Sequence, residues 1–329
     1  MLRRHFLMAA TFGGKQDERF LVRSQSPDGG WHSLAYGLLR SGQSLTGFVL
    51  CSLSDSTPAS SVDRGIAFLR ANTDDEGAVG RMNPLIHDYP NYATALALSA
   101  ELRWRRSGWE DRVARLAAYL RSQQFTEEEG WKGGDAPYGA WGMGGDRRTP
   151  PHAGHVDLSM TRHVLEALAG AGTSNNSPTM RRARVFLGRL QNDDGGFHFS
   201  TVVADANKVG GTRSYGTATA DGILSLSASG GEAARIVAAR DWLVGHHRPD
   251  GAPGFSGEAY RRWPQGLRFY YAAASAKAFH RTGLAPDWEQ TRLLRAEQRG
   301  DGSWSNPEPL VKEDDPLIAT GFALQAILR

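Results

Sequence analysis

A short cassette recurs six times along the chain, and this repeat constrains the fold more than any other feature of the sequence. Each copy contains an aromatic–Leu pair (Leu–Leu in one copy), a polar residue four positions after the Leu, and an acid–Gly turn three positions later. The two clearest copies run from Phe20 to Trp31 and from Phe186 to Phe197. The other four run from Trp242 to Gly251, from Leu293 to Trp304, from Phe68 to Gly77 and from Tyr119 to Trp131. Because the copies are spread over the chain, they predict one repeating architecture.

The local chemistry of a cassette is that of a helix that ends in a turn. The aromatic residue and the Leu lie on the buried face, Gly supplies the positive φ of a helix C-terminus, and the Trp or Phe after it folds back against the helix. We call this last apolar residue the plug residue. In the copy that runs from Tyr119 to Trp131, which is the third along the chain, an acidic insertion, Glu127 to Glu129, precedes the expected plug residue, Trp131. The cassette Gln, such as Gln25, is expected to bond backbone groups at the end of a neighbouring helix.

A second type of helix is predicted between successive cassettes. These helices are rich in small residues and almost free of Lys, so we expect them to be buried, whereas the cassette helices carry Arg on one face and are expected outside. The predicted bounds of the buried helices are 44–53, 92–103, 156–171, 215–228, 267–281 and 315–328. Five of them align on a Thr (Thr46, Thr94, Thr161, Thr219 and Thr320), and Ala272 takes its place in the fifth repeat. Six outer and six inner helices in alternation predict an all-α fold, an (α/α)6 barrel or toroid.

Composition agrees with a single helical domain over residues 16–329. The chain has 329 residues, of which 40% are hydrophobic, so it can bury a large core. The net charge of +3 comes from 38 basic and 35 acidic residues, and the basic ones are spread over the outer helices. This pattern is typical of a solvated surface and argues against a nucleic-acid partner. The one cysteine, Cys51, excludes a disulfide within the chain.

Residues 1–15 have two interpretations, a targeting segment or an unstructured N-terminus. Arg3 and Arg4 precede a weakly apolar stretch, Phe6 to Gly14, which is the form of a twin-arginine export signal. The first interpretation implies that the protein is exported from the cytoplasm, and the second implies that it stays there. No run of the sequence reaches the length of about 18 apolar residues that indicates a membrane-spanning helix.

The cassette of aromatic–Leu, Gln, Asp–Gly and Trp resembles the QW repeat of squalene-hopene and oxidosqualene cyclases. The alternating small-residue helices resemble those of the β subunits of protein prenyltransferases. The resemblance covers residues 16–329 and implies the toroid of this superfamily, with a central apolar cavity for a polyprenoid. An isoprenoid or lipid ligand and peripheral contact with a membrane are therefore expected. The sequence leaves the oligomeric state undetermined.

The signature chemistry of each related branch is missing. Squalene cyclases protonate an alkene with an Asp-x-Asp-Asp motif, in which neighbouring carboxylates keep one acid protonated, and the chain has no such tetrapeptide. Prenyltransferases hold zinc with an Asp-x-Cys on the fifth inner helix and a His before the Thr of the sixth. Here residues 269–272 contain no Cys, and Ala319 precedes Thr320. We therefore expect no zinc site, no other metal and no cofactor.

Candidate site residues follow from the phase of the inner helices. If these helices share a phase, the residue before each aligned Thr points along one face, and positions three or four away lie on it too. Asp221 is the leading candidate for a catalytic acid, because a carboxylate in mid-helix among small residues is unfavourable unless it is paired. Asp157 and Asp315 are further catalytic candidates that also suit helix N-caps. The expected substrate-binding residues are Tyr89, His155, His163, Tyr215, Arg268, Tyr270 and Tyr271.

Two features of these candidates have alternative interpretations. Asp221 is either a cavity-facing acid with a raised pKa or the buried partner of Arg162 or Arg268. The candidate tyrosines and Phe269 cluster at the N-terminal ends of three inner helices, where rings stabilise a carbocation through their π faces. Ordinary core packing uses aromatic residues as well.

Three functions remain open from the sequence. The first is a terpene cyclase or prenyl-transferring enzyme that uses a single carboxylate, such as Asp221, without metal. The second is a non-catalytic toroid that binds an isoprenoid, a lipid or a protein segment, which the missing signatures favour. The third is a carbohydrate-active α/α barrel with paired carboxylates among Asp135, Asp157 and Asp315, and the cassettes argue against it. We favour a polyprenoid-related protein, either an isomerase- or transferase-type enzyme or a binding protein.

Overall fold

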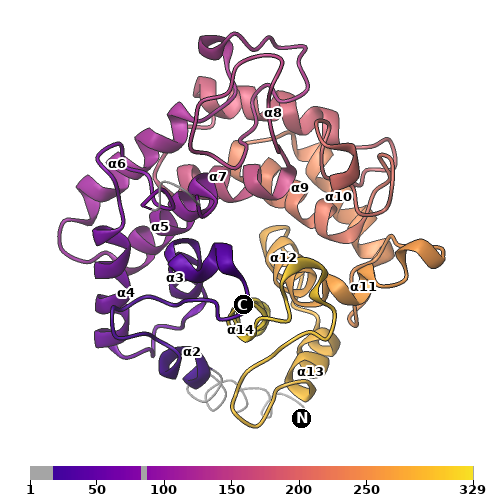
Figure 1. Ribbon diagram of the computed structural model, residues 1–329. Coiled ribbons are helices and arrows are strands. Elements are labelled where there is room, and N and C mark those ends of the chain that lie inside the picture. Colours follow the sequence, from indigo (N-terminus) through magenta and orange to yellow (C-terminus); the bar gives the residue numbers. More distant parts are fainter. Residues whose placement is uncertain (1–17, 83–86, 329) are drawn as a thin grey trace, which may run out of the picture.

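The computed structural model describes residues 18–82 and 87–328, and these residues form thirteen α-helices and no β-strand. Twelve of the helices alternate between an inner and an outer ring around a common centre (Figure 1). The inner helices are α3 (Gln43–Ser52), α5 (Pro90–Trp104), α7 (Leu158–Gly170), α9 (Gly216–Ser229), α12 (Arg268–Arg281) and α14 (Pro316–Ile327). The outer helices are α2 (Arg19–Arg23), α4 (Ala59–Ala71), α6 (Trp109–Ser122), α8 (Pro178–Leu190), α10 (Ala233–His246) and α13 (Trp288–Ala296). The predicted all-α toroid is confirmed.

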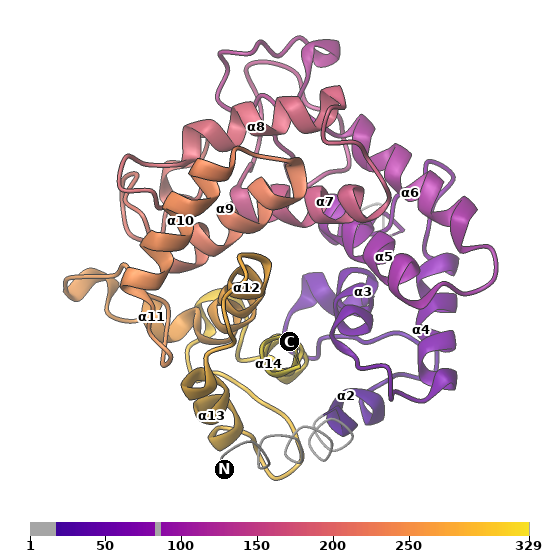
Figure 2. The ribbon, with the colours of Figure 1, turned by 180° about the vertical axis from the view of Figure 1, so that it is seen from behind.

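The inner helices form a closed ring, in which each one packs against the next. The ring closes where α14 packs against α3, as the views in Figure 1 and Figure 2 show from opposite sides. At this contact a side chain at Gly321 would overlap the ring of Phe48, so Gly allows the two helices to approach closely. The rings of Phe48 and Phe322 pack edge to face with their centroids 4.8 Å apart.

The residue pattern of each ring follows from its surroundings. Twelve of the 14 residues of α9 are buried, because this inner helix has neighbours on several sides. In the outer helix α8 five of 13 residues are buried, and they recur every three or four positions along one face. The Arg residues of α8 lie on the remaining surface. The predicted burial of the inner helices and exposure of one face of the outer helices are confirmed.

The aligned Thr residues bind the plug residues of the cassettes. The Thr46 hydroxyl accepts a hydrogen bond from the backbone N–H of Trp31 at 2.9 Å, and Thr320 does the same for Trp304 at 3.0 Å. The equivalent pairs in the second, third and fourth repeats are Val79 with Thr94, Trp141 with Thr161, and Phe197 with Thr219. The column of Thr residues therefore satisfies one buried backbone donor in each repeat that has it.

The fifth repeat departs from this pattern. Ala272 has no hydroxyl, and the residue at the plug position is Pro253, which has no N–H that would need an acceptor. The N–H of the preceding residue, Ala252, donates to the Pro264 carbonyl at 3.0 Å. The repeat also has His247 in place of the cassette Gln. A ring nitrogen of His247 lies 2.7 Å from a carboxylate oxygen of Asp287, the N-cap residue of α13.

The cassette Gln side chains join neighbouring outer helices. Gln25 donates to the carbonyl of Gly29 in its own turn at 2.9 Å and to that of Ser61, in the first turn of α4, at 2.8 Å. Gln191 makes the same pair of bonds, the second of them to Arg235 in the first turn of α10 at 2.9 Å. The predicted bonding of a cassette Gln to the end of a neighbouring helix is confirmed.

The third cassette ends later in the sequence than its spacing predicted. Its plug residue is Trp141, whose fully buried ring donates from Nε1 to the Leu120 carbonyl at 2.7 Å. Gln124 accordingly donates to the carbonyl of Gly139, two residues before the plug, at 2.9 Å. The assignment of Trp131 as the plug residue is therefore wrong. Trp131 belongs to the insertion, which contains a Gly–Trp pair that looks like the end of a cassette.

The loops differ in length at the two ends of the ring. Those leading from an outer to an inner helix are long and contain α11 (Trp263–Gly266) and the 3-10 helices η1 (Gly37–Ser41), η2 (Glu127–Glu129), η3 (Ala204–Ala206), η4 (Glu258–Tyr260) and η5 (Pro309–Val311). Loops in the other direction are short, such as residues 105–108 and 230–232. The long loops therefore surround the end of the ring at which all six inner helices begin. We call this end the N-terminal mouth.

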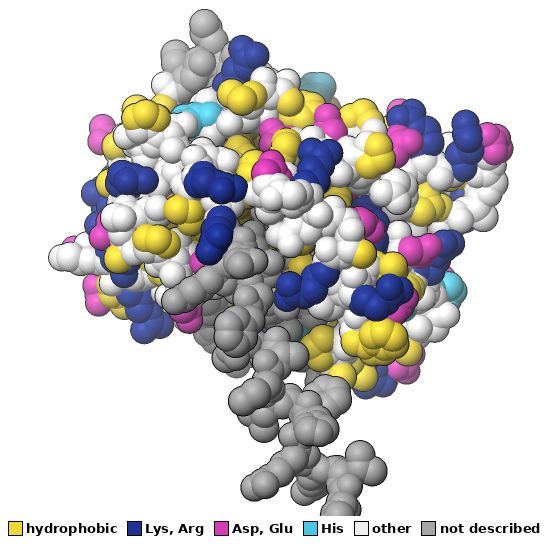
Figure 3. Space-filling model, turned by 90° about the horizontal axis from the view of Figure 1, so that it is seen from below, with side chains coloured by type: hydrophobic (Ala, Val, Ile, Leu, Met, Phe, Trp, Pro, Cys, Tyr) yellow, Lys and Arg dark blue, Asp and Glu magenta, His cyan; other side chains and the backbone are white. Residues whose placement is uncertain are grey.

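The surface carries charges of both signs. On the face shown in Figure 3, Lys and Arg side chains are interspersed with acidic and apolar ones. Within residues 18–82 and 87–328, no helix combines the length and the apolar character needed to cross a membrane. The predicted export signal in residues 1–15 lies outside the described residues.

Candidate functional site

The beginnings of five inner helices and the loops before them surround a hollow at the centre of the N-terminal mouth. One part of this hollow has a volume of about 190 Å³ and is lined by Ser159, Phe199, Lys208, Thr217, Leu267, Tyr270, Val311 and Phe322. An adjoining part, also of about 190 Å³, is lined by Tyr89, Tyr92, Met143, Asp157, Ser159, Met160 and Phe199. Because the two parts share Ser159 and Phe199, we describe them together as the central cavity.

Aromatic side chains provide much of the wall of the central cavity. Tyr270 and Phe322 pack edge to face with their ring centroids 5.2 Å apart, and Phe199 lies where the two parts of the cavity meet. On the other side, Tyr92 packs edge to face against His163 at 4.7 Å. Such a wall favours hydrocarbon, and its π faces also attract positive charge.

Tyr270 connects the central cavity with a fully buried carboxylate. Its hydroxyl donates to Asp221 Oδ2 at 2.6 Å and lies 2.7 Å from Ser159 Oγ. Asp221 has no exposed surface and accepts a second bond from Arg162 Nη1 at 3.2 Å. Of the two partners considered from the sequence, the structure therefore pairs Asp221 with Arg162. Asp221 is not among the lining residues, so Tyr270 stands between its carboxylate and a ligand in the cavity.

Arg162 extends this network to two further charges. Its Nε lies 3.0 Å from Glu166 Oε2, and Glu166 Oε1 lies 2.8 Å from Lys277 Nζ, so two cations and two carboxylates alternate across α7, α9 and α12. Burial raises the pKa of Asp221 to about 6, against the opposing effect of Arg162. Burial also acts to raise the pKa of Glu166, but Arg162 and Lys277 outweigh it and hold that pKa well below its usual range.

His163 lies beside the network and is not a lining residue of the central cavity. Among the described residues its Nε2 has no hydrogen-bond partner. Burial, aided by the positive charge of Arg162, lowers the pKa of His163 well below its ordinary value. A neutral imidazole is therefore expected here, in apolar contact with Tyr92.

Lys208 is the one basic side chain among the lining residues of the central cavity. Its Nζ lies 3.6 Å from the centroid of the Phe199 ring and 6.0 Å from that of Trp263. Its one hydrogen bond to a described residue is a long one, 3.4 Å, to the Ala206 carbonyl. Burial lowers the pKa of Lys208 to about 8. The side chain therefore remains mostly protonated at neutral pH.

Asp157 and Asp315 cap helices, as the N-cap interpretation of the sequence predicts. Asp157 accepts a hydrogen bond from a first-turn N–H of α7 at 2.7 Å and pairs with His155 at 2.7 Å. Asp315 accepts from the Leu317 N–H of α14 at 2.9 Å and from the Ser33 hydroxyl. Asp157 also lines the central cavity, whereas Asp315 does not.

The carboxylates considered for a carbohydrate-active site are not brought together. Asp135 accepts from the backbone N–H of Lys132 at 2.7 Å, within the insertion of the third repeat. Asp157 and Asp315 each cap a different helix. Each of the three carboxylates thus has its own local partner.

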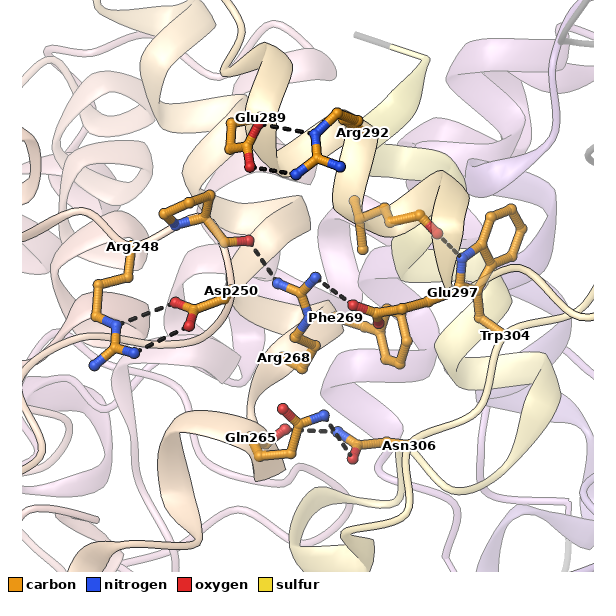
Figure 4. A network of polar contacts seen from close by, with 12 residues as sticks. Arg248, Asp250, Gln265, Arg268, Phe269, Glu289, Arg292, Glu297, Trp304 and Asn306 are labelled. Carbon is orange, nitrogen blue, oxygen red and sulfur yellow. Dashed lines mark hydrogen bonds and ion pairs between the residues drawn. The ribbon is translucent and has the colours of Figure 1, made fainter.

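Arg268 points away from the central cavity. Its guanidinium donates to the Pro249 carbonyl at 2.6 Å and pairs with Glu297 at 2.6 Å, so it joins the cassettes of the fifth and sixth repeats (Figure 4). Arg268 lies only two residues before Tyr270. Because successive residues of an α-helix point about 100° apart, these two side chains face different sides of α12. The inner helices do share a phase, because Ser159, Thr217 and Tyr270 each line the cavity two positions before the aligned residue of their helix. Arg268 lies four positions before Ala272, so the expectation that it binds substrate placed the wrong face of the helix towards the cavity.

Of the other predicted binding residues, Tyr89 and Tyr270 line the central cavity and the remaining tyrosines do not. The Tyr271 hydroxyl lies 2.6 Å from a ring nitrogen of His247, towards the outer ring. Tyr215 is fully buried and packs edge to face against Phe255 with the centroids 5.5 Å apart. Both side chains therefore belong to the packing between repeats.

Two buried carboxylates that cap inner helices were missed in the sequence. Glu313 accepts from the backbone N–H groups of Phe269 and Tyr270 at 3.0 and 2.7 Å, at the start of α12. Burial raises the pKa of Glu313 to about 7, although these two bonds oppose the shift. Asp88 accepts from the Ser44 N–H of α3 at 3.0 Å. The available signal is that each acid closely precedes the Pro that begins an inner helix of the next repeat in the ring.

Most lining residues were also missed, among them Ser159, Phe199, Lys208 and Phe322. Phe199 and Lys208 lie in the loop between α8 and α9, where no helical periodicity exists to place them. The sequence singles out Lys208 only by the rarity of lysine, because the chain has five lysines and its other basic residues are arginines and histidines.

Within the described ranges, no group of three or more His, Cys, Asp or Glu side chains is placed to hold a metal ion. A separate hollow of about 280 Å³ lies between the insertion of the third repeat and the end of α6, and Arg147, Arg148 and His155 contribute to its lining. Two of these residues, Arg147 and Arg148, are exposed, so this hollow is a surface feature of the insertion.

No family model and no curated protein matches the sequence. Solved structures do match over almost the whole chain. The type II terpene cyclase MstE from Scytonema superposes with a TM-score of 0.58 at 13% identity, covering 95% of this chain and 96% of that chain. A D-mannose isomerase has a TM-score of 0.59 at 12% identity, covering 95% of both chains. The chain has the α/α toroid fold.

A cellobiose 2-epimerase from Bacillus thermoamylovorans is similar to the same degree, with a TM-score of 0.58 at 12% identity, covering 94% of this chain and 95% of that chain. A variant of MstE in complex with its substrate, geranylgeranyl dihydroxybenzoate, has a TM-score of 0.58 at 14% identity, covering 95% of both chains. A terpene cyclase and sugar-converting enzymes thus share this architecture. The likeness establishes the fold, and the function has to be argued from the site.

Proposed function

We propose that the central cavity binds an isoprenoid. The observation that carries the proposal is the aromatic wall formed by Tyr92, Phe199, Tyr270 and Phe322 where the inner helices begin. The two adjoining parts, of about 190 Å³ each, together fall at the lower end of the range of about 300–1,000 Å³ that is typical of small-molecule sites. The similarity to MstE, which takes a geranylgeranyl substrate, supports the same class of ligand.

The polar groups of the cavity suit an isoprenoid better than a sugar. A sugar site needs several donors and acceptors that converge on hydroxyl groups. Here the Tyr270 and Ser159 hydroxyls are bonded to each other, and the Asp157 carboxylate is held by its helix and by His155. The polar groups that remain, Lys208 and the N–H groups at the start of α9, are donors and provide no acceptor for sugar hydroxyl groups, whereas the aromatic rings remain available to hydrocarbon.

Lipid analysis and direct binding test the proposal. Native mass spectrometry of the purified protein should show a retained isoprenoid, and farnesol should quench its Trp fluorescence in a saturable manner. Ser159→Trp should abolish both signals, because a Trp side chain at this shared lining position fills the junction of the two parts of the cavity. Ser60→Trp, on the exposed face of α4, is the matched control and should bind normally. Equal binding by the two variants would place the ligand elsewhere and refute the proposal.

A second candidate function is acid-catalysed isomerisation or cyclisation of the bound isoprenoid. The observation that favours it is the hydrogen bond from Tyr270, which lines the cavity, to Asp221, whose pKa is raised to about 6. The protonated fraction of Asp221 grows as the pH falls towards 6, and in this form Asp221 can return a proton to Tyr270 when Tyr270 gives one to an alkene.

Tyr270→Phe separates this activity from binding. The change removes the hydroxyl but keeps the ring and the ion pair between Asp221 and Arg162. A catalytic role predicts that the native protein converts a polyprene such as squalene to a cyclic product, detected by gas chromatography with mass spectrometry, and that Tyr270→Phe binds the polyprene without converting it. Conversion at the native rate by Tyr270→Phe would exclude this pathway.

A further inference from the structure

Lys208 is a cation in largely apolar surroundings, and no carboxylate of the described residues lies within ion-pair distance of it, although Asp157 and Asp221 favour its charged form from farther away. The Nζ lies over the ring of Phe199 at 3.6 Å, and the long hydrogen bond to the Ala206 carbonyl is its one polar contact in the described part of the chain. The side chain is partly buried, and removing a charge from water costs free energy unless the charge is paired and hydrogen-bonded. By comparison, Lys277 in the neighbouring network pairs with Glu166 at 2.8 Å. The surroundings of Lys208 are therefore incomplete without an anion.

The helix that begins beside Lys208 also lacks a negative charge. Four inner helices, α3, α7, α12 and α14, receive a carboxylate at their first turn, from Asp88, Asp157, Glu313 and Asp315 respectively. No side chain caps α9. The N–H of its first residue bonds to the Pro253 carbonyl, and the next two N–H groups, of Thr217 and Ala218, have no hydrogen-bond partner among the described residues. Free N–H groups at a helix start attract anions.

These two features meet in the same part of the central cavity, because Lys208 and Thr217 both line it. Phe322 and Leu267 form apolar walls of that part. A ligand with a negative head at one end and an apolar tail would satisfy the lysine, the helix start and the aromatic wall together. A neutral isoprenoid alcohol would leave the lysine uncompensated.

We propose that Lys208, together with the first turn of α9, binds the anionic head group of the cavity's ligand, a carboxylate or a phosphate on an isoprenoid tail. This inference rests on the proposed function and specifies the chemical class of the ligand. The ammonium group contributes a charge-assisted hydrogen bond, and the aromatic wall holds the tail.

Three probes with one tail test the head group: farnesoic acid, farnesyl phosphate and farnesol. We expect at least one of the two anions to bind the native protein about tenfold more tightly than farnesol, as measured by Trp fluorescence, because hydrogen bonds to charged groups are among the stronger ones. Lys208→Gln should remove that preference, and Lys208→Arg should retain most of it. Lys132→Gln, at an exposed position in the insertion, is the control and should match the native protein. The anion that shows the larger preference identifies the head group as carboxylate or phosphate.

Farnesol binding as tightly as both anions, or a full preference for an anion in Lys208→Gln, would overturn the inference while the proposed isoprenoid binding stands. Palmitate and hexadecanol, an anion and an alcohol with the same unbranched tail, test whether the anion site exists even if the ligand is not an isoprenoid. If no farnesyl compound binds but palmitate binds more tightly than hexadecanol in a Lys208-dependent manner, the anion site is supported and the isoprenoid proposal fails. If none of the five compounds binds, both proposals are refuted.

Discussion

Replacing either of two glycines in the third repeat with Ala tests where the cassette ends. Gly130 and Gly139 have almost the same backbone conformation, with φ of +87° and +86°. An L-residue in this left-handed region costs about 1–2 kcal/mol, so both substitutions share this term. They differ in what the new methyl group meets. At Gly130 the nearest neighbouring atom is the Pro150 Cδ at 3.7 Å, whereas at Gly139 the added Cβ would overlap the backbone carbonyl of Arg182.

The backbone must therefore move in Gly139→Ala and need not move in Gly130→Ala. The carbonyl that would be displaced belongs to α8, whose first turn accepts the hydrogen bond from Gln124 to Thr179 at 2.9 Å. Forcing extra atoms into a packed contact costs about 1–3 kcal/mol beyond the backbone strain. We expect a loss of stability of about 2–5 kcal/mol for Gly139→Ala and of about 1–2 kcal/mol for Gly130→Ala.

Urea denaturation followed by Trp fluorescence and by far-UV circular dichroism measures both variants. Coincidence of the two transitions checks that unfolding is two-state, which justifies comparing free energies of unfolding. If Gly130→Ala is as destabilising as Gly139→Ala, or more so, then the cassette ends at Trp131. That result would refute the assignment of Trp141 as the plug residue.

Trp31→Ala and Trp304→Ala should each lower the free energy of unfolding by about 3–5 kcal/mol in urea denaturation, because both rings are fully buried and hydrogen-bonded at Nε1. A much smaller loss for Trp31→Ala would contradict this equivalence and would mean that the short first outer helix contributes less to stability. The pKa of Glu313 is raised to about 7 in the folded state, whereas the ordinary value in the unfolded state is near 4.5. Between these two pH values the folded state keeps a proton that the unfolded state has lost, so the free energy of unfolding should fall by on the order of 3 kcal/mol as the pH rises from about 4.5 to 7. Glu313→Gln should flatten that dependence in denaturation curves measured across the range, and an unchanged slope would argue against the raised pKa. Asp221→Asn removes the charged partner of Arg162 and should cost about 3–5 kcal/mol in urea denaturation, whereas a gain in stability would mean that Asp221 is protonated in the folded state.

The sequence by itself determined the repeat architecture, because the relations that define a cassette are local. The Gln and the Gly turn that it binds lie four residues apart, as Gln25 and Gly29 do, so their relation is visible in the spacing of the sequence. The aligned Thr residues were visible in the sequence, but the alignment does not show which groups their hydroxyls bind. Only the structure shows that Thr46 and its equivalents bind the N–H of the plug residue.

The third repeat shows where local spacing fails. The insertion separates the helix end from its turn, and the first Gly–aromatic pair, Gly130-Trp131, satisfies the pattern as well as the sequence can judge. The choice of Trp141 depends on the Thr161 hydroxyl and the Leu120 carbonyl, which lie about 20 residues away along the chain in opposite directions. Tertiary contact decides between two locally equivalent candidates.

The site residues could be predicted from the sequence less well than the fold, because their positions depend on tertiary structure. Asp221 was found from the sequence because a carboxylate among small residues violates the composition of a buried helix, but its partner had to be chosen between Arg162 and Arg268. That choice depends on the rotation of α7 and α12 about their axes, which places Arg162 in the network and Arg268 between two cassettes. Lys208 lies in a loop without periodicity, so its position in the central cavity follows only from the folded path of that loop. Helix spacing is encoded residue by residue, whereas the cavity is formed where several repeats with loops of different length converge, and no single repeat specifies that convergence.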